Sequence, residues 1–174
     1  MRMKTMAAAL LAAGISVSAA QAATDGGGGN LTITGSIIQP PCSIDPGSVD
    51  QQVELGAVSS STINGGKIGR KTPFEIKLLD CDAPSTVRVS IWGTEDSLDK
   101  TLLHLGSGTA KGAGIAFFDS TANQIKLGEN SRDIQVPTGN FTLSLAAALK
   151  GNAANSVAEP GDFTSTATFK LEYN

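Results

Sequence analysis

The stretch that decides the fold is Phe163-Thr-Ser-Thr-Ala-Thr-Phe-Lys-Leu-Glu-Tyr-Asn174. Apart from Ser165, every residue of one parity is apolar: Phe163, Ala167, Phe169, Leu171 and Tyr173. The other parity is polar. This period of two, with β-branched and aromatic residues, predicts a strand with one face in a core and the other in water. No strand follows it in the sequence, and an uncovered edge is a template for pairing. We therefore expect another segment to pair beside it.

A second stretch with the same alternation lies near the opposite end of the chain. Asn30-Leu-Thr-Ile-Thr-Gly-Ser-Ile-Ile38 places Leu31, Ile33, Gly35 and Ile37 on one face. Before it lie four consecutive glycines, residues 26–29, which form a flexible tether. An apolar strand at one end and an unfinished edge at the other predict head-to-tail assembly. Such a contact is heterologous and generates open filaments rather than closed dimers.

Four segments together resemble the pilins of the chaperone–usher pathway. They are Asn30–Cys42, Val49–Gly56, Phe74–Asp82 and the C-terminal segment, in which Gly161 is fourteenth from the end and Tyr173 is next to last. The resemblance covers nearly all of the chain after its leader, with the motifs in the right order, although Thr94–Gly114 carries no recognisable motif.

The resemblance implies an all-β fold, an incomplete immunoglobulin-like antiparallel β-sandwich that lacks its final strand. It implies a pilin domain over residues 37–174 and an N-terminal donor-strand extension over residues 23–36. The donor side chains would be Leu31, Ile33, Gly35 and Ile37. The acceptor groove would lie between the first strand and the terminal strand and would be lined by Phe163, Ala167, Phe169, Leu171 and Tyr173.

The function implied is that of a structural pilus subunit that polymerises by donor-strand exchange and supports cell adhesion. Its partners would be neighbouring subunits in a homo- or heteropolymer, a periplasmic chaperone that fills the groove temporarily, and an outer-membrane usher. The protein would be exported through the periplasm to a fimbrium at the cell surface. The alternative is a minor adaptor or a carbohydrate-binding adhesive subunit at the tip. A tip adhesin of this family would carry a separate receptor domain, and aromatic residues for stacking on sugars are scarce, at 5%.

The first 22 residues have the pattern of a signal peptide. Arg2 and Lys4 form the positive region, an apolar run follows, and Ala20-Gln21-Ala22 is a small-x-small cleavage site. A transmembrane helix is the competing interpretation, but spanning a bilayer takes about 20 apolar residues and this run is shorter. We therefore expect cleavage between Ala22 and Ala23.

Charge and cysteine content limit the possible functions further. Of the 13 basic residues, two lie in the leader, which leaves 11 against 16 acidic residues and a net charge near −5. This balance predicts no binding to nucleic acid.

In an exported chain, the two cysteines Cys42 and Cys81 favour a disulfide over two unrelated buried thiols. Metal binding is a less favoured interpretation still, because two cysteines and the single histidine, His104, do not supply the four ligands of a tetrahedral site. The resemblance implies the same bond, which would contribute about 4 kcal/mol by restricting the unfolded chain.

The rest of the chain reads as short strands separated by turns. A first strand is expected over Ile37–Ile44, broken by two prolines and resumed at Gln52–Leu55, with a loop over Ser59–Arg70. Leu102–Leu105 fits a short strand or a turn of helix. Further strands are expected around Phe74–Leu78, Val87–Ile91, Gly114–Asp119, Gln124–Leu127 and Phe141–Ala147. About seven short strands without a helix-length periodic run predict an antiparallel β-sandwich.

Catalytic motifs are absent from the sequence. His104 has no adjacent acid or nucleophile motif, and no phosphate-binding, dinucleotide-binding or metalloprotease fingerprint occurs. Asp80 and Asp82 flank Cys81 and could suggest a cation site, but a solvated strand end is the preferred interpretation. Trp92, the only tryptophan, is expected in the core or at its rim. We therefore predict a protein that is not an enzyme, with no catalytic, cofactor-binding or metal-binding residues.

Overall fold

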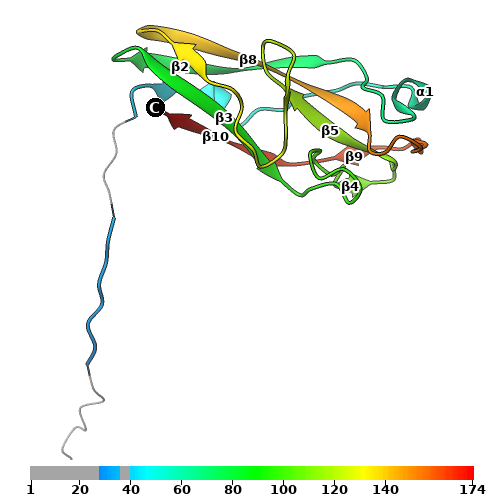
Figure 1. Cartoon of the computed structure of the whole chain (residues 1–174), viewed down its shortest axis with the longest axis horizontal. Helices are drawn as coiled ribbons and strands as arrows, with labels where there is room; N and C mark the ends of the chain where they lie inside the picture. Colours follow the sequence, from blue (N-terminus) through cyan, green and yellow to red (C-terminus); the bar gives the residue numbers. More distant parts are fainter. Residues whose placement is uncertain (1–27, 36–39) are drawn as a thin grey trace, which may run out of the picture. The chain divides into compact units, whose positions relative to one another are not determined.

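The computed structural model describes residues 28–35 and 40–174. The chain divides into two units, Met1–Ile37 and Ile38–Asn174. Every helix and strand of the described residues belongs to the second unit (Figure 1). Residues 28–35 of the first unit form no strand, and each of them is exposed.

Two antiparallel sheets make up most of the second unit. The order of the larger sheet is β1-β2-β8-β5-β6, and that of the smaller is β10-β3-β7, with a separate pair β4-β9. The five strands of the larger sheet are β1 (Ser43–Ile44), β2 (Thr72–Cys81), β8 (Gly139–Gly151), β5 (Ala113–Phe118) and β6 (Gln124–Ile125). The remaining strands are β10 (Ala167–Tyr173), β3 (Ser85–Gly93), β7 (Ile134–Val136), β4 (Ser107–Gly108) and β9 (Phe163–Thr164). The helical segments are a 3-10 turn at Pro46–Ser48 and α1 (Ser60–Ile63), which lies at the end of the domain opposite the C-terminus (Figure 1).

The core lies between the two larger sheets. Ile76 and Leu78 of β2 and Leu143 of β8 are buried, and they belong to the same cluster as Val87 and Val89 of β3. On β2 and β3 these residues occupy alternate positions, so each strand turns one face inward. The burial of alternating Ile, Leu and Val side chains is therefore what holds the two sheets together.

Most of the strands expected from sequence are confirmed. The alternating runs at Phe74–Leu78, Val87–Ile91 and Phe141–Ala147 are the centres of β2, β3 and β8. The strands expected around Gly114–Asp119 and Gln124–Leu127 are β5 and β6, which pair with each other in antiparallel orientation. The all-β, antiparallel fold class is confirmed with them.

Three expectations were wrong or incomplete. Gln52–Leu55 forms no strand, because no neighbouring strand pairs with it in the described structure. The loop expected over Ser59–Arg70 contains one helical turn, α1. Leu102–Leu105 is neither strand nor helix but a loop held by isolated bridges, among them Leu103 to Ile115. The short strands β4 and β7 had no clear signal in the sequence, and the terminal stretch divides into β9 and β10.

The disulfide expected from sequence joins Cys42 to Cys81, and both residues are buried. Cys81 ends β2, and Cys42 directly precedes β1, which pairs with β2. The backbone N–H of Asp82 also donates a hydrogen bond to the carbonyl of Pro41, at 2.9 Å. The start of the domain is thus fixed to the end of β2 by a covalent bond and a hydrogen bond.

Candidate functional site

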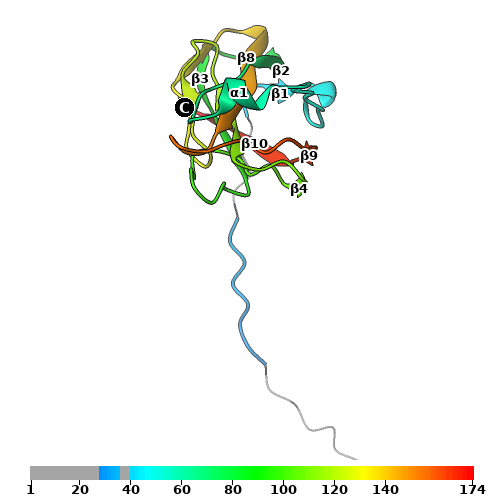
Figure 2. The same ribbon diagram turned by 90° about the vertical axis from the view of Figure 1, so that its right-hand side faces the viewer.

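A largely apolar groove of about 1120 Å³ opens on the surface of the domain. It lies between two segments that are far apart in the sequence. One is residues 49–58, which we call the N-terminal rim; the other is Phe163–Phe169, the C-terminal rim. In the view of Figure 2, β9 and β10 lie below β1 and α1, and the N-terminal rim connects those upper elements along the chain.

The N-terminal rim has the sequence pattern of a strand but lacks strand pairing. Val53 and Leu55 are half-buried, whereas Gln52 and Glu54 between and beside them are exposed. Within the described part of the chain, no backbone–backbone hydrogen bond involves residues 50–58. The side chain of Gln51 instead donates hydrogen bonds to the carbonyls of Ser48 and Glu75, at 2.9 and 2.7 Å. The rim is therefore anchored at its start, and its own backbone groups remain available for pairing.

The C-terminal rim continues into β10, which has a partner on one side only. Among the described residues, β10 pairs with β3 and with no other strand. Phe169 and Leu171 lie opposite Ile91 and Val89 of β3 and face the same side of the sheet. Ile91 and Val89 are buried, yet Phe169 and Leu171 are only half-buried. The inner face of β10 thus resembles a core face from which one neighbouring strand is missing.

Tyr173, the last residue of β10, is also incompletely packed and lacks a hydrogen-bond partner. Its side chain packs against the core, but its hydroxyl is buried and finds no hydrogen-bond partner within the described structure. Burial raises the pKa of this hydroxyl. A buried hydroxyl without a partner is unfavourable, so this position would gain from a polar group supplied by a further segment.

The floor of the groove is made of core side chains from both sheets and one loop. They are Phe74, Ile91, Leu103, Leu105, Ala113, Ile115, Phe117, Ala147 and Leu149. All except Phe74 belong to the buried core. The groove therefore opens directly onto the hydrophobic core.

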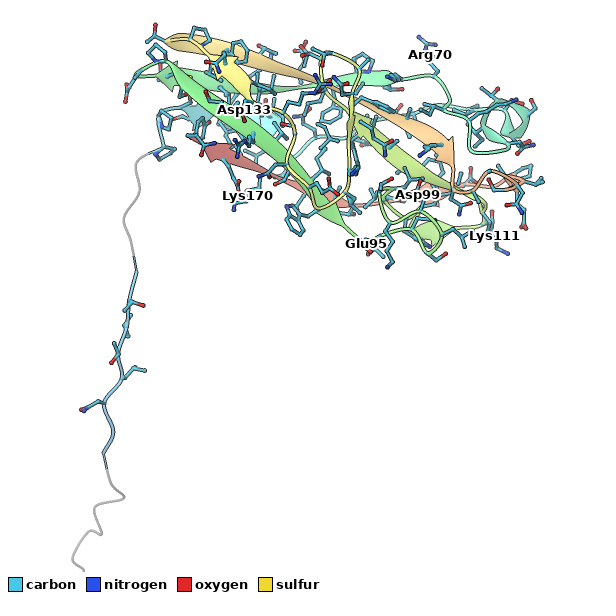
Figure 3. The ribbon with its side chains drawn as sticks, in the orientation of Figure 1. Arg70, Glu95, Asp99, Lys111, Asp133 and Lys170 are labelled. Atoms are coloured by element: carbon cyan, nitrogen blue, oxygen red, sulfur yellow. A yellow bond between two sulfur atoms is a disulfide. The ribbon has the colours of Figure 1, made fainter. Side chains whose placement is uncertain are left out.

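The loop that carries Leu103 and Leu105 is held in place by polar contacts. Lys150 Nζ of β8 lies 3.0 Å from Asp99 Oδ2, in a salt bridge that is mostly shielded from solvent (Asp99 is labelled in Figure 3). The side-chain amide of Asn152 donates to both oxygens of the buried Asp96, at 3.2 Å. Burial alone would raise the pKa of Asp99, but hydrogen bonds from Thr101 and Lys150 outweigh it and lower the pKa. These contacts fix the loop, and with it two of the groove's floor residues.

A tight corner closes one end of the groove. The paired strands β4 and β9 meet there, and Gly108 has a φ of 136° and lies so close to Asp162 that an added Cβ would collide with its carbonyl. Lys111 and Glu159 face each other across this corner, 3.7 Å apart, at the α1 end of the domain (Lys111 is labelled in Figure 3). Glycine is needed at position 108 because the two backbones approach so closely.

The structure distributes the residues singled out in the sequence as follows. Phe163, Ala167 and Phe169 line the groove, whereas Leu171 and Tyr173 lie farther along β10, outside the lining. Leu31 and Ile33 are 84% and 83% exposed, and no atom lies within 4 Å of where a Cβ on Gly35 would stand. Ile37, Ala22 and Ala23 lie outside the described residues.

The family resemblance predicted a groove between the first strand and the terminal strand, but lining residues were predicted only on the terminal strand. Leu103 and Leu105 lay in a segment without a motif, and Val53 and Leu55 were taken only as part of a strand. The alternation from Val49 through Leu55 was the available signal for the second rim, but nothing in it shows that this segment faces the terminal strand.

The described residues contain no group of three or more His, Cys, Asp or Glu side chains that could hold a metal ion. His104 is exposed, and its Nδ1 accepts a hydrogen bond from the backbone of Gly106. No helix of the described structure is long and apolar enough to span a bilayer. The groove is thus an open surface, lined largely by apolar side chains that continue into the core.

Solved structures show which class of protein has this fold. The P pilus rod subunit PapA superposes with a TM-score of 0.65 at 21% identity, over 78% of this chain and 100% of its own. A subunit from the structure of a chaperone–usher pilus superposes with a TM-score of 0.66 at 24% identity, over 87% of this chain and 99% of its own. The fold is therefore that of pilus subunits.

Sequence comparison then identifies the family. Residues 31–174 match the family model described as "Fimbrial protein". The Fimbria A protein of Serratia marcescens is 44% identical, over 98% of this chain and 97% of its own. The Major MR/P fimbria protein of Proteus mirabilis is 39% identical, over 95% and 96%. The chain belongs to the fimbrial protein family. It is a structural, non-enzymatic subunit of a fimbria on the cell surface, with other subunits of the polymer as its partners.

Proposed function

We propose that the groove is an acceptor site for the N-terminal extension of another subunit, and that fimbriae grow by repeated insertion of this segment. We call residues 23–36 the arm. In this proposal residues 1–22 are a signal peptide cleaved between Ala22 and Ala23. Residues 37–174 form an incomplete immunoglobulin-like sandwich, and the inserted arm supplies its missing strand.

One observation carries the proposal: the same chain has an unpaired apolar strand pattern and an unfilled apolar groove. The described part of the arm exposes Leu31 and Ile33 almost fully, which is unfavourable for a protein that stays alone in water. Within the described residues, the N-terminal rim has no backbone pairing, the β10 part of the C-terminal rim is paired on one side only, and the floor consists of core residues. Inserting one into the other removes both defects, since the inserted strand can pair with both rims.

The energies are sufficient for a durable joint. Burying Leu31, Ile33 and Ile37 contributes roughly 1.5–3 kcal/mol each, a gross gain of about 5–9 kcal/mol. Each new backbone hydrogen bond adds about 0.5–1.5 kcal/mol, before the entropy of ordering the arm is subtracted. Insertion between two rims permits twice as many backbone bonds as addition to a single edge.

The proposal also explains why the subunit would need a chaperone and an usher. Before insertion, the apolar rim side chains Val53, Leu55, Phe163 and Phe169 are only half-buried, so the free subunit would tend to aggregate. A periplasmic chaperone would cover the groove. At an outer-membrane usher, the arm of the next subunit would then replace the chaperone. The relatives are matched over nearly their whole length, and one is named a major fimbrial protein. This supports the role of a repeating subunit over that of a tip adhesin.

Removal of the arm tests the proposal. A subunit without residues 23–36 should fold with the chaperone and still accept a synthetic peptide spanning Asn30–Ile38, but it should not join the groove of another subunit. A matched control peptide, with Leu31 and Ile33 changed to Ser, should fail to displace the chaperone. A peptide with Thr32 and Thr34 changed to Ser should displace it normally. Normal fimbriae built from the truncated subunit would contradict the proposal.

A further inference from the structure

The N-terminal rim is held to the domain weakly for a segment that forms one side of the groove. Just before it, β1 pairs with β2 through only two residues, Ser43 and Ile44. Asp45 N–H donates to the carbonyl of Lys77 at 2.9 Å, and Ser48 Oγ accepts from Lys77 N–H at 3.0 Å. Beyond Gln51, no backbone hydrogen bond within the described residues holds the rim. A force applied at the start of this segment would break these contacts one after another.

The same segment begins at the disulfide. Cys42 is bonded to Cys81 at the end of β2, and the Pro41 carbonyl is bonded to Asp82 N–H. Unlike β1, β2 is a long strand whose register with β8 runs from Thr72 opposite Ala147 to Cys81 opposite Gly139. A force that enters through β2 is therefore shared by a whole ladder of hydrogen bonds and by the core side chains beneath it.

We propose that the Cys42–Cys81 bond is a mechanical clamp, which transfers tension from the arm into β2 so that the N-terminal rim carries no load. This inference rests on the proposed function, because a fimbria under tension pulls each subunit through its arm and through the strand seated in its groove. With the clamp, the load passes from residue 41 directly to Cys81. Without it, the load would peel β1 and then the rim from the domain.

In the filament, the clamp would protect the joint with the neighbouring subunit. The rim forms one side of the groove that holds the neighbour's arm, so peeling it would open the groove and release the neighbour. The clamp therefore makes the strength of one joint independent of the pull on the next. Because the bond is buried, with Cys42 3% and Cys81 4% exposed, reductants reach it slowly.

Pulling on single molecules through two different points tests the clamp. The full mature chain is loaded with the Asn30–Ile38 peptide, which carries one handle at its C-terminal end. The second handle is attached either to Thr32 on the arm or to the exposed Ala83, two residues after the end of β2. In the wild type, the peptide should leave the groove at the same force from both points. In Cys42→Ala/Cys81→Ala, the force should fall about twofold or more from Thr32 only, since hydrogen bonds peeled in sequence resist less than bonds loaded together.

The Ala83 geometry is the matched control within the same variant, because general loss of stability would lower the force from both points. Equal forces from Thr32 and Ala83 in the variant would overturn the clamp. If the variant does not fold, the wild type pulled through Thr32 before and after prolonged TCEP treatment, with loss of the disulfide verified by mass, gives the same comparison. Peptide binding without force separates the two proposals: failure to bind contradicts the acceptor groove, whereas normal binding with unchanged rupture force contradicts the clamp alone.

Discussion

At the scale of single residues, Gly35 poses a distinct question. It shares the parity of Leu31 and Ile33 but has no side chain, and a glycine within a strand suggests close backbone approach or a shallow pocket. Alternatively, it only bends the chain ahead of the domain. The arm itself has room for a larger side chain, since nothing lies within 4 Å of the position of a Cβ. The constraint, if there is one, must come from the groove of the neighbouring subunit.

We predict that Gly35→Leu slows polymerisation sharply while the subunit's fold, disulfide and chaperone complex stay normal. The added volume would overpack the neighbour's groove at a cost of roughly 1–3 kcal/mol. Gly35→Ala is the matched control and should be tolerated. The measurement is the rate at which peptides spanning Asn30–Ile38, with and without the change, displace chaperone from wild-type subunits. Equal rates for the Leu and wild-type peptides would show that Gly35 only bends the chain.

Asp119 has a local structural role at the turn of the β5–β6 hairpin. Its Oδ1 accepts hydrogen bonds from the backbone N–H groups of Thr121 and Asn123, both at 2.9 Å, and from the hydroxyl of Thr121. Burial alone would raise its pKa, but these hydrogen bonds to the carboxylate outweigh it and lower the pKa below the ordinary value. The charged form of Asp119 is thus the one that the fold stabilises.

We predict that Asp119→Ala lowers the free energy of unfolding by about 1–3 kcal/mol at neutral pH. Because the pKa is lowered in the folded state, this stabilisation is fully present above the ordinary value of 3.8 and is lost as the pH falls through the folded pKa. Urea unfolding of the peptide-filled subunit between pH 7 and pH 2 measures the difference. A difference that stays constant down to pH 2 would contradict the assignment, and Asp119→Asn should show a smaller pH dependence than the wild type.

At the scale of elements, β10 shows how one strand can be complete in sequence and incomplete in packing. Its alternation places Phe169 and Leu171 on one face and Thr168 and Lys170 on the other. Its pairing with β3 satisfies one edge, and the other edge faces the groove. The inner face packs against the core and adjoins the groove, whereas Thr168 and Lys170 on the outer face are exposed, so neighbouring positions provide matched variants.

We predict that Phe169→Ala weakens binding of the donor peptide by at least about tenfold, equivalent to 1.4 kcal/mol, because Phe169 lines the groove. Thr168→Ala, the neighbouring change on the opposite face, should leave the affinity within about twofold, less than 0.5 kcal/mol. Fluorescence anisotropy with a labelled Asn30–Ile38 peptide measures both. Equal losses from the two variants would indicate a general effect on β10 rather than a contact with the donor.

At the scale of the whole molecule, the proposal gives the arm and the groove complementary roles. In the proposed assembly, a lone subunit leaves apolar side chains uncovered at both places, and each of these surfaces would be covered by the other surface on a second copy. The sequence leaves only the short stretch from Ser36 to Gln39 between the arm and the domain, so we expect insertion into a second copy rather than self-insertion. The subunit would therefore be more stable in the polymer than alone.

We predict that the mature protein starts at Ala23 and contains one disulfide. Intact mass of protein from purified fimbriae should correspond to residues 23–174 and should rise by about two mass units, one hydrogen per sulfur, on denaturation and reduction. Free thiols at Cys42 and Cys81 in exported material would contradict the disulfide. A mass that retains any of residues 1–22 would contradict the cleavage site.

The sequence alone determined the features that depend on the local chain. Alternation of apolar and polar residues located β2, β3, β8 and the terminal strand, because the direction of successive side chains follows directly from an extended backbone. The cysteine pair predicted the disulfide, since an oxidising compartment and two thiols leave few alternatives. The donor and acceptor faces were proposed for the same reason: each is a run of alternate residues.

The tertiary structure decided which segments lie beside each other. Residues 49–58 have the alternation expected of a strand but form none, because a strand requires a lateral partner and the described structure has none at this position. Leu103 and Leu105 became floor residues through a loop without any periodic pattern, held by Lys150 and Asn152 from a distant strand and the loop after it. Lateral pairing and loop anchoring depend on contacts distant in the sequence, so the groove emerged only once the two rims were brought together around the core.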